Sequence, residues 1–163
     1  MSASGVFGVN YKKSYGTDPA IVPAKLGDYG SDTDGEWVFV KASAAVAQYA
    51  FVLIASDNTV AELTTTNATN TVRQVGVAQV ALAANEYGWV WIGGAMGGGT
   101  GKGIKGKALT LFAANAKMYT TGTAGCADDA ATVLINNVTG LTTVGGTTTA
   151  IELLSTGVLS VNG

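Results

Sequence analysis

Histidine is absent from the sequence, and cysteine occurs once, at position 126. A single cysteine cannot form a disulfide within the chain. As a nucleophile, Cys126 would need a neighbouring base to form its thiolate, and histidine, the usual base, is missing. Because Cys126 lies among small residues in the segment 123–127, we interpret it as a packing residue. We expect no catalytic residue in this chain and no enzymatic function.

Charged residues are scarce. Asp, Glu, Lys and Arg make up 12% of the chain, against about 25% in ordinary soluble domains. Because a free monomer usually keeps a charged surface for solubility, this scarcity indicates that much of the surface meets other protein; a neutral monomer is the alternative. The net charge of −2 argues against a nucleic-acid partner, which would require a basic face. The neighbouring Lys102, Lys105, Lys107 and Lys117 lack the interleaved aromatic residues of a base-stacking platform.

Long apolar segments are also missing. The first residues, MSASGVFGVNYKK, have no apolar core of the kind that a signal peptide carries. We therefore expect no signal peptide. The longest apolar stretch, 44–55, is interrupted by Gln48 and is far shorter than the roughly 20 residues that cross a bilayer. We therefore expect no membrane partner.

Proline is confined to the N-terminal region. Both prolines lie within residues 1–35, and no period of two or 3.6 residues persists among the apolar residues there. This region is predicted to be an extended arm rather than a domain; a disordered tail is the alternative. Apolar groups that cannot be buried locally are expected to be buried against a partner. The predicted contacts with a partner protein or neighbouring subunit are Phe7, Tyr11, Lys12, Lys13, Tyr15, Ile21 and Val22.

Residues 36–163 form the predicted β-domain. Short runs of aromatic and β-branched residues are separated by Gly, Asn and Asp turns, which favours an all-β fold, a compact β-sandwich or small β-barrel. The alanine runs at 42–47 and 81–84 are compatible with single helical turns. Trp89 and Trp91 point to the same side of their strand, and we expect them in the core or in a subunit contact rather than in a ligand platform. The strands are predicted at 37–40, 49–55, 59–63, 72–82, 87–92, 108–112, 117–121, 133–135, 138–141, 151–154 and 158–161.

The glycine-rich loop at 93–106 invites comparison with nucleotide-binding loops. A P-loop would need glycine at position 96 and serine or threonine at 103, where the chain has Met96 and Gly103. A formal G-x-G-x-x-G match starts at Gly101, but that fingerprint must open a helix, and residues 107–121 have a strand-like pattern. We therefore predict a flexible or closely packed loop and no cofactor.

The acidic residues match no metal or catalytic pattern. Asp32, Asp34 and Glu36 lack the glycine and the final glutamate that an EF-hand loop requires. A different oxygen-ligand site stays open, but a solvated acidic turn is the favoured interpretation. Asp128 and Asp129 are neighbours in sequence, whereas a catalytic pair converges from separate elements. We predict that they form a turn that binds its own backbone.

A tandem pattern connects the two halves of the β-domain. Residues 35–92 and 107–141 each contain an alanine-rich step, a Tyr-bearing strand, a polar turn and a Thr/Ala/Asn-rich stretch. The phrases GEWVFVKASAAVAQYAFVLI, VGVAQVALAANEYGWVWI and LFAANAKMYTTGTAGCADDAAT resemble the capsid decoration (cement) proteins of tailed bacteriophages. The resemblance covers roughly Glu36 to Leu141 and contains no catalytic motif.

The resemblance implies an all-β virion protein that binds the outer surface of an icosahedral capsid, stabilises the shell and often forms a homotrimer. The implied partner is the major capsid protein, with assembly in the host cytoplasm. Two other classes stay open. A head-fibre or tail-associated adhesion module would expose Trp89, Trp91 and a mobile glycine loop. An enzyme that held phosphate on the glycine loop would need a helix after Gly106.

Overall fold

The computed structural model describes residues 8–163, and the regular secondary structure of the described chain is almost entirely β. This confirms the predicted all-β class. Its one helix, α1 (Thr65–Ala68), has a capping box in which Thr64 and Asn67 bind each other's backbone amides. The strands are β1 (Tyr29–Asp32), β2 (Gly35–Ala42), β3 (Phe51–Ile54), β4 (Thr59–Glu62), β5 (Val72–Ala78), β6 (Tyr87–Gly94), β7 (Lys105–Ala108), β8 (Lys117–Thr120), β9 (Ala127–Asp128), β10 (Leu134–Gly140) and β11 (Thr149–Asn162).

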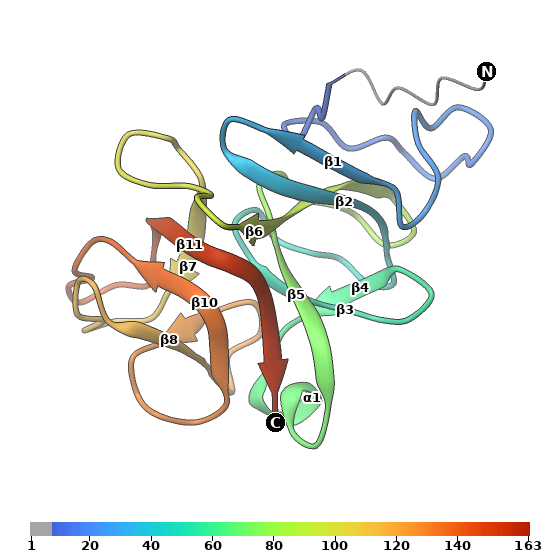
Figure 1. Cartoon of the computed structure of the whole chain (residues 1–163). Helices are drawn as coiled ribbons and strands as arrows, with labels where there is room; N and C mark the ends of the chain where they lie inside the picture. The colour runs from blue at the N-terminus through green and yellow to red at the C-terminus, as the bar shows by residue number, and fades with distance from the viewer. Residues whose placement is uncertain (1–7) are drawn as a thin grey trace.

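Six strands close into a β-barrel (Figure 1). The pairings run β2–β4–β3–β5–β11–β6 and return from β6 to β2, so the ring has no open edge. Of the two predicted forms, a β-sandwich and a small β-barrel, the chain therefore adopts the barrel. One apolar cluster draws on β2, β3, β4, β5 and β6 and fills the inside of the ring. Its strand members are Val38, Val40, Ala42, Val52, Ile54, Val60, Ala78, Val90 and Ile92.

The second half of the chain, from β7 to β11, packs beside the barrel and shares β11 with it (Figure 1). The last residues of β11 pair with β5, whereas Thr149–Glu152 pair with β7. From β11 the pairings continue through β10, β8 and β9 to β7, which returns to β11. Because β11 belongs to both rings, it joins the two halves into one fold.

The outer face of the barrel is apolar as well. In β2, Val38 and Val40 point into the barrel, whereas Trp37 and Phe39 belong to a second apolar cluster outside it. That cluster also contains residues of β7, β8, β10 and β11, so the second half covers part of the barrel's outer face. All eight residues of β6 are buried, which is what a strand covered on both faces requires.

Three loops repeat the same backbone turn, which gives the tandem sequence pattern a structural basis. Tyr49, Asn85 and Asn115 lie two residues before β3, β6 and β8, and their φ angles are 64°, 68° and 61°. In each loop the next N–H donates to the carbonyl three residues earlier, and the pairs are Ala50–Ala47, Glu86–Ala83 and Ala116–Ala113. The alanine runs therefore form turns and extended segments, not helical turns.

The first two of these loops also pair with each other. The Val46 N–H donates to the Leu82 carbonyl at 2.8 Å, and the Leu82 N–H donates to the Val46 carbonyl at 2.9 Å. This reciprocal pairing closes one end of the barrel with two similar loops.

Several strand predictions need correction. The strand predicted at 108–112 lies instead at Lys105–Ala108, because Leu111 adopts a φ of 68° that ends any extended run. The two segments predicted within 133–141 form the single strand β10, with a register shift near Asn137, and those within 151–161 form the single long strand β11. In the region predicted as an arm, β1 pairs with β2 as an additional strand.

Candidate interaction surface

The N-terminal arm lies on the outer aromatic face of the barrel. The Tyr11 ring stacks on the Trp37 indole with centroids 4.3 Å apart and planes 7° apart. The Tyr15 ring meets Phe39 edge-on at 5.8 Å. Hydrogen bonds fix the backbone beside these rings: the Tyr15 N–H donates to the Tyr87 carbonyl at 2.9 Å, and the Tyr87 N–H donates to the Gly16 carbonyl at 3.1 Å. The arm is thus attached to its own domain.

Burial on this face changes the chemistry of both tyrosines. Burial raises the pKa of Tyr11, and the nearby carboxylates of Asp34 and Asp32 raise it further. The Tyr11 hydroxyl also donates to Asp34 Oδ2 at 3.5 Å. Burial raises the pKa of Tyr15. The neutral phenol is therefore the form that the folded arm favours.

The residues predicted to contact a partner divide into two groups. Tyr11, Tyr15 and Val22 are partly buried against the chain's own apolar cluster, so the prediction that they require a partner for burial is wrong. Ile21 is 71% exposed and stays available for a contact, as do the exposed Lys12 and Lys13, whose Nζ atoms lie over the rings of Tyr11 and Tyr15. Phe7 lies outside the described residues.

Trp89 and Trp91 are core residues, with exposed fractions of 1% and 0%. Trp89 packs edge-on against Phe39 at 5.2 Å, and Trp91 Nε1 donates to the Asp34 carbonyl at 2.9 Å. The expectation of a core position is confirmed, and the expectation that they contact a capsid or neighbouring subunit is corrected. The arm and the glycine loop cover the outer face on which the indoles lie, so they cannot reach a partner in this conformation.

The glycine-rich loop between β6 and β7 is closely tied to the rest of the fold. The Gly98 N–H donates to the Asp34 carbonyl, and the Gly99 N–H donates to the Leu153 carbonyl. The Gly101 N–H donates to Glu152 Oε1 at 2.9 Å. The strand β7, not a helix, follows at Lys105, so the loop lacks the helix that a phosphate-binding fingerprint needs. The prediction of a closely packed loop describes most of this segment.

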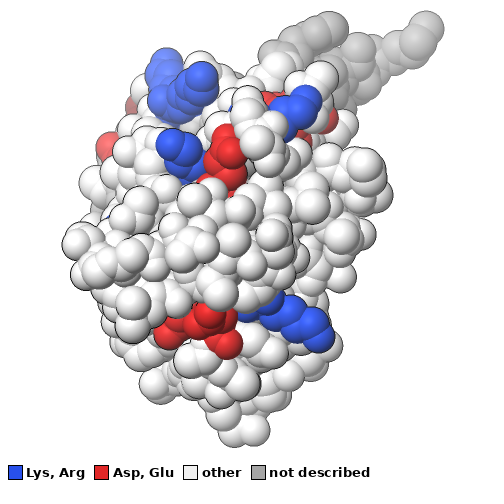
Figure 2. All heavy atoms as spheres, turned by 90° about the vertical axis from the view of Figure 1, so that its left-hand side faces the viewer, with Lys and Arg blue, Asp and Glu red and all other residues white. Residues whose placement is uncertain are grey.

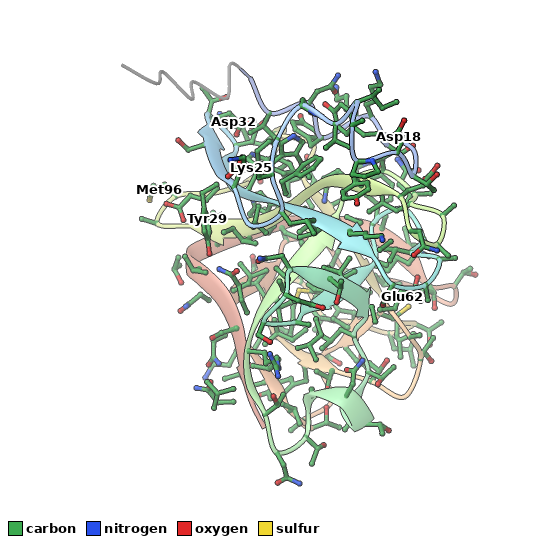
Figure 3. The ribbon with its side chains drawn as sticks, turned by 90° about the vertical axis from the view of Figure 1, so that its right-hand side faces the viewer. Asp18, Lys25, Tyr29, Asp32, Glu62 and Met96 are labelled. Carbon is green, nitrogen blue, oxygen red and sulfur yellow. The ribbon has the colours of Figure 1, made fainter. Side chains whose placement is uncertain are left out.

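Exposed apolar side chains occur on the side of the molecule that carries the arm (Figure 3). Leu26 is 39% exposed, Tyr29 64% and Met96 85%. In Figure 3, Tyr29 and Met96 project from the ribbon on this side, Tyr29 from the edge strand β1 and Met96 from the tip of the glycine loop. Sequence analysis missed these three residues, because nothing in the local pattern marks them as exposed.

A broad face of the second half carries almost no charge. Among residues 130–163, Glu152 is the one charged residue. Figure 2, which faces this half, shows a wide band without Lys, Arg, Asp or Glu between charged groups above and below it. The exposed residues of 130–163 are mostly threonine, alanine and glycine, and include Thr142, Thr143, Gly145, Gly146, Thr147 and Thr148.

The acidic residues singled out by sequence act on the backbone. Asp32 Oδ1 accepts from the Asp34 N–H at 2.8 Å and from Trp37 Nε1 at 3.0 Å. Asp128 Oδ1 accepts from the Asp129 N–H, and Asp129 Oδ2 accepts from the Ala113 N–H. These contacts are those of polar turns. Within residues 8–163, no group of three or more His, Cys, Asp or Glu side chains is placed to hold a metal ion.

Cys126 is buried and free, as a packing residue would be. Burial raises the pKa of its thiol; the nearby Lys107 lowers it and Glu62 raises it. A thiol kept protonated by its apolar surroundings is a poor nucleophile.

A polar pocket of about 290 Å³ lies where the arm meets the glycine loop. The arm contributes Tyr11 and Lys12, and the loop contributes Lys102 and Gly103. Gln48, Tyr49, Gln79 and Val80 complete its lining. The pocket is therefore built from segments that lie far apart in the sequence.

Comparison of the chain with protein-family models, with curated proteins and with solved structures gave no match. In the described part of the chain, α1 is four residues long, and no helix there has the length and apolar character to cross a membrane.

Proposed function

We propose that this chain is a phage virion structural protein that binds the outer surface of the icosahedral capsid and stabilises the shell. Its partner in this proposal is the major capsid protein. The sequence resemblance to decoration proteins supports assignment to this class of virion structural protein. The location that follows is the outer surface of the virion, after assembly in the host cytoplasm.

The observation that carries the proposal is the uncharged face of the second half (Figure 2). Charged residues are depleted in the buried centre of protein interfaces. A face whose exposed residues are mainly threonine, alanine and glycine has short side chains, so ordering it against a flat partner costs little side-chain entropy. These properties suit a subunit that lies on a repetitive protein surface.

Repetition also explains why each contact can be modest. A shell presents many identical sites, and linked contacts gain affinity from effective concentration without new interactions. A homotrimer would present three copies of the face to one local symmetry axis. We therefore propose a trimer on the capsid, in which Ile21, Lys12 and Lys13 lie near a neighbouring subunit or the shell.

Co-sedimentation with shells assembled from the major capsid protein of the same phage tests the proposal. We expect the chain to pellet with shells and to raise the temperature at which they disrupt. The variant Thr142→Glu with Thr148→Glu adds two charges at exposed residues of the nearly uncharged segment 130–163 and should weaken binding. Ser56→Glu with Thr66→Glu adds the same charge at exposed residues outside the second half and should bind as the unaltered chain does.

Failure of the unaltered chain to pellet with shells would refute the proposed function. Equal binding by both double variants would leave capsid binding in place but would refute the role of the uncharged face. Light scattering in solution and on shells measures the trimer separately, and a monomer in both conditions would refute it.

The adhesion-module alternative receives no support from a specific observation. It rested on exposed Trp89 and Trp91 as a ligand platform, and both side chains are buried.

A further inference from the structure

The pocket between the arm and the glycine loop has a floor that hydrogen bonds hold in place. The buried Gln79 side chain pairs with the backbone of Lys105 in both directions: its Nε2 donates to the Lys105 carbonyl at 2.9 Å, and its Oε1 accepts from the Lys105 N–H at 3.0 Å. Gln48 Nε2 donates to the Gln79 carbonyl at 3.1 Å. On the arm side, Tyr11 is fixed by its stacking on Trp37. The walls therefore do not have to be ordered by a ligand.

The rim of this pocket is positive. Lys12 enters from the arm and Lys102 from the glycine loop, and both are exposed. An ammonium group offers three donors and no acceptor, and no Asp or Glu lines the pocket. Two carboxylates lie beside the lining segments without lining the pocket: Asp34 accepts from the Tyr11 hydroxyl at 3.5 Å, and Glu152 accepts from the Gly101 N–H at 2.9 Å. The Lys12 Nζ lies over the Tyr11 ring, 5.8 Å from its centroid.

We infer that this pocket binds a carboxylate side chain of an acidic peptide segment on a partner protein. Two lysines line a volume of about 290 Å³, which is at the small end of the range for ligand pockets and suits one side chain with its flanking backbone. Gln48 retains an amide hydrogen and Tyr49 lines the wall, so both can meet the peptide. The inference deepens the proposed function, because the acidic segment would belong to the capsid protein.

Nucleic acid would offer anionic groups as well, but the rest of the molecule does not favour it. With nine Lys and Arg residues in all and a net charge of −2, the chain has few cations from which to form the extended basic surface that phosphate backbones require. The pocket joins the arm to the glycine loop, and occupation by a partner's carboxylate would hold these two segments together. A shell-bound subunit would thus be fixed at a point separate from the uncharged face.

Fluorescence anisotropy with a labelled hexaglutamate peptide tests the pocket without capsids. We expect weak binding that decreases as salt is added, and a loss of about fivefold or more in affinity for Lys12→Gln with Lys102→Gln, since each exposed ion pair contributes modestly. The matched control is Lys25→Gln with Lys117→Gln, which removes the same charge from exposed lysines that do not line the pocket. Thermal melts establish that both double variants are folded.

Each outcome decides the inference. Equal loss in the two double variants would show a general charge effect and would overturn it, as would no binding of hexaglutamate. Tighter binding of a single-stranded oligonucleotide or of inorganic phosphate than of the peptide would also overturn it. In the shell assay, a Lys12/Lys102 double variant that pellets as the unaltered chain does would overturn the pocket inference and leave the capsid proposal in place. If hexaglutamate binds at the pocket but the chain does not bind shells, the capsid proposal is refuted and the pocket inference stands.

Discussion

Tyr11 of the arm and Trp37 of β2 stack with ring centroids 4.3 Å apart and nearly parallel planes. The stack is the point at which a segment without regular secondary structure joins the barrel. It buries an indole that would otherwise form part of an open aromatic face with Phe39 and Trp89. The arm is therefore part of the folded domain, and its removal is expected to affect stability as well as any partner contact.

Replacing Tyr11 with alanine should destabilise the arm. The variant loses a stacked aromatic pair, which contributes about 0.5–1.5 kcal/mol beyond the area that it buries. We expect the free energy of unfolding to fall by about 1–3 kcal/mol and the tryptophan emission to move to longer wavelength. Urea unfolding followed by fluorescence measures both. Tyr29→Ala is the control, since Tyr29 is 64% exposed, and a loss of similar size there would contradict the role of the stack.

The raised pKa values of Tyr11 and Tyr15 predict a loss of stability at alkaline pH. The folded state favours the neutral phenols, so their contribution is complete below the ordinary tyrosine pKa of about 10 and is lost as the pH rises through the higher folded value. Tyr11→Phe should keep the stack and show a smaller decrease in stability above about pH 10. Asp34→Asn should act in the same direction, because Asp34 contributes to the shift. Thermal melts across pH measure these changes, and a Tyr11→Phe profile as steep as that of the unaltered chain would contradict the prediction.

The glycine loop allows a matched pair of substitutions. Gly98 and Gly101 have similar positive φ angles of 68° and 77°, but a β-carbon at Gly98 would overlap the Leu153 carbonyl, whereas one at Gly101 would meet open space. Gly101→Ala should therefore cost about 1–2 kcal/mol for the backbone conformation alone. Gly98→Ala should cost about 1–3 kcal/mol more, the usual cost of overpacking. Chemical denaturation measures both, and equal losses would show that the loop moves freely at Gly98.

Replacing Gln79, the buried polar residue in the floor of the pocket, should strongly reduce the stability of the fold. Gln79→Ala would leave the N–H and carbonyl of Lys105 without their side-chain partners, at a cost of about 1–3 kcal/mol for each group that stays buried. We expect a loss of about 2–4 kcal/mol in the free energy of unfolding, together with loss of hexaglutamate binding. Gln74→Ala, in β5, should change stability by less than about 0.5 kcal/mol. A Gln79→Ala variant as stable as the unaltered chain would mean that water replaces the side chain.

Local sequence determined most strands and the turn chemistry of this protein. Runs of aromatic and β-branched residues around Trp37, Phe51, Val75 and Trp89 became β2, β3, β5 and β6, because such residues fit a pleated, buried surface. The repeated alanine-rich phrases became three copies of one turn with a left-handed residue. The glycine loop was likewise predictable as a non-phosphate loop, because the residues at positions 96 and 103 are wrong for that chemistry.

Tertiary structure alone decided what covers each face. The uninterrupted apolar run of β6 was a signal that both of its faces are buried, but no local pattern says which distant segment covers the outer one. The arm residues Tyr11 and Tyr15 have irregular spacing, since their partners Trp37 and Phe39 are fixed by the barrel and not by the arm's own geometry. The strand expected at 108–112 failed for a related reason: Leu111 has the composition of a strand residue, but its loop pairs with residues 144 and 145, and the backbone turns there. The pocket shared by Lys12 and Lys102 depends on these long-range contacts, which join residues that the sequence keeps 90 positions apart.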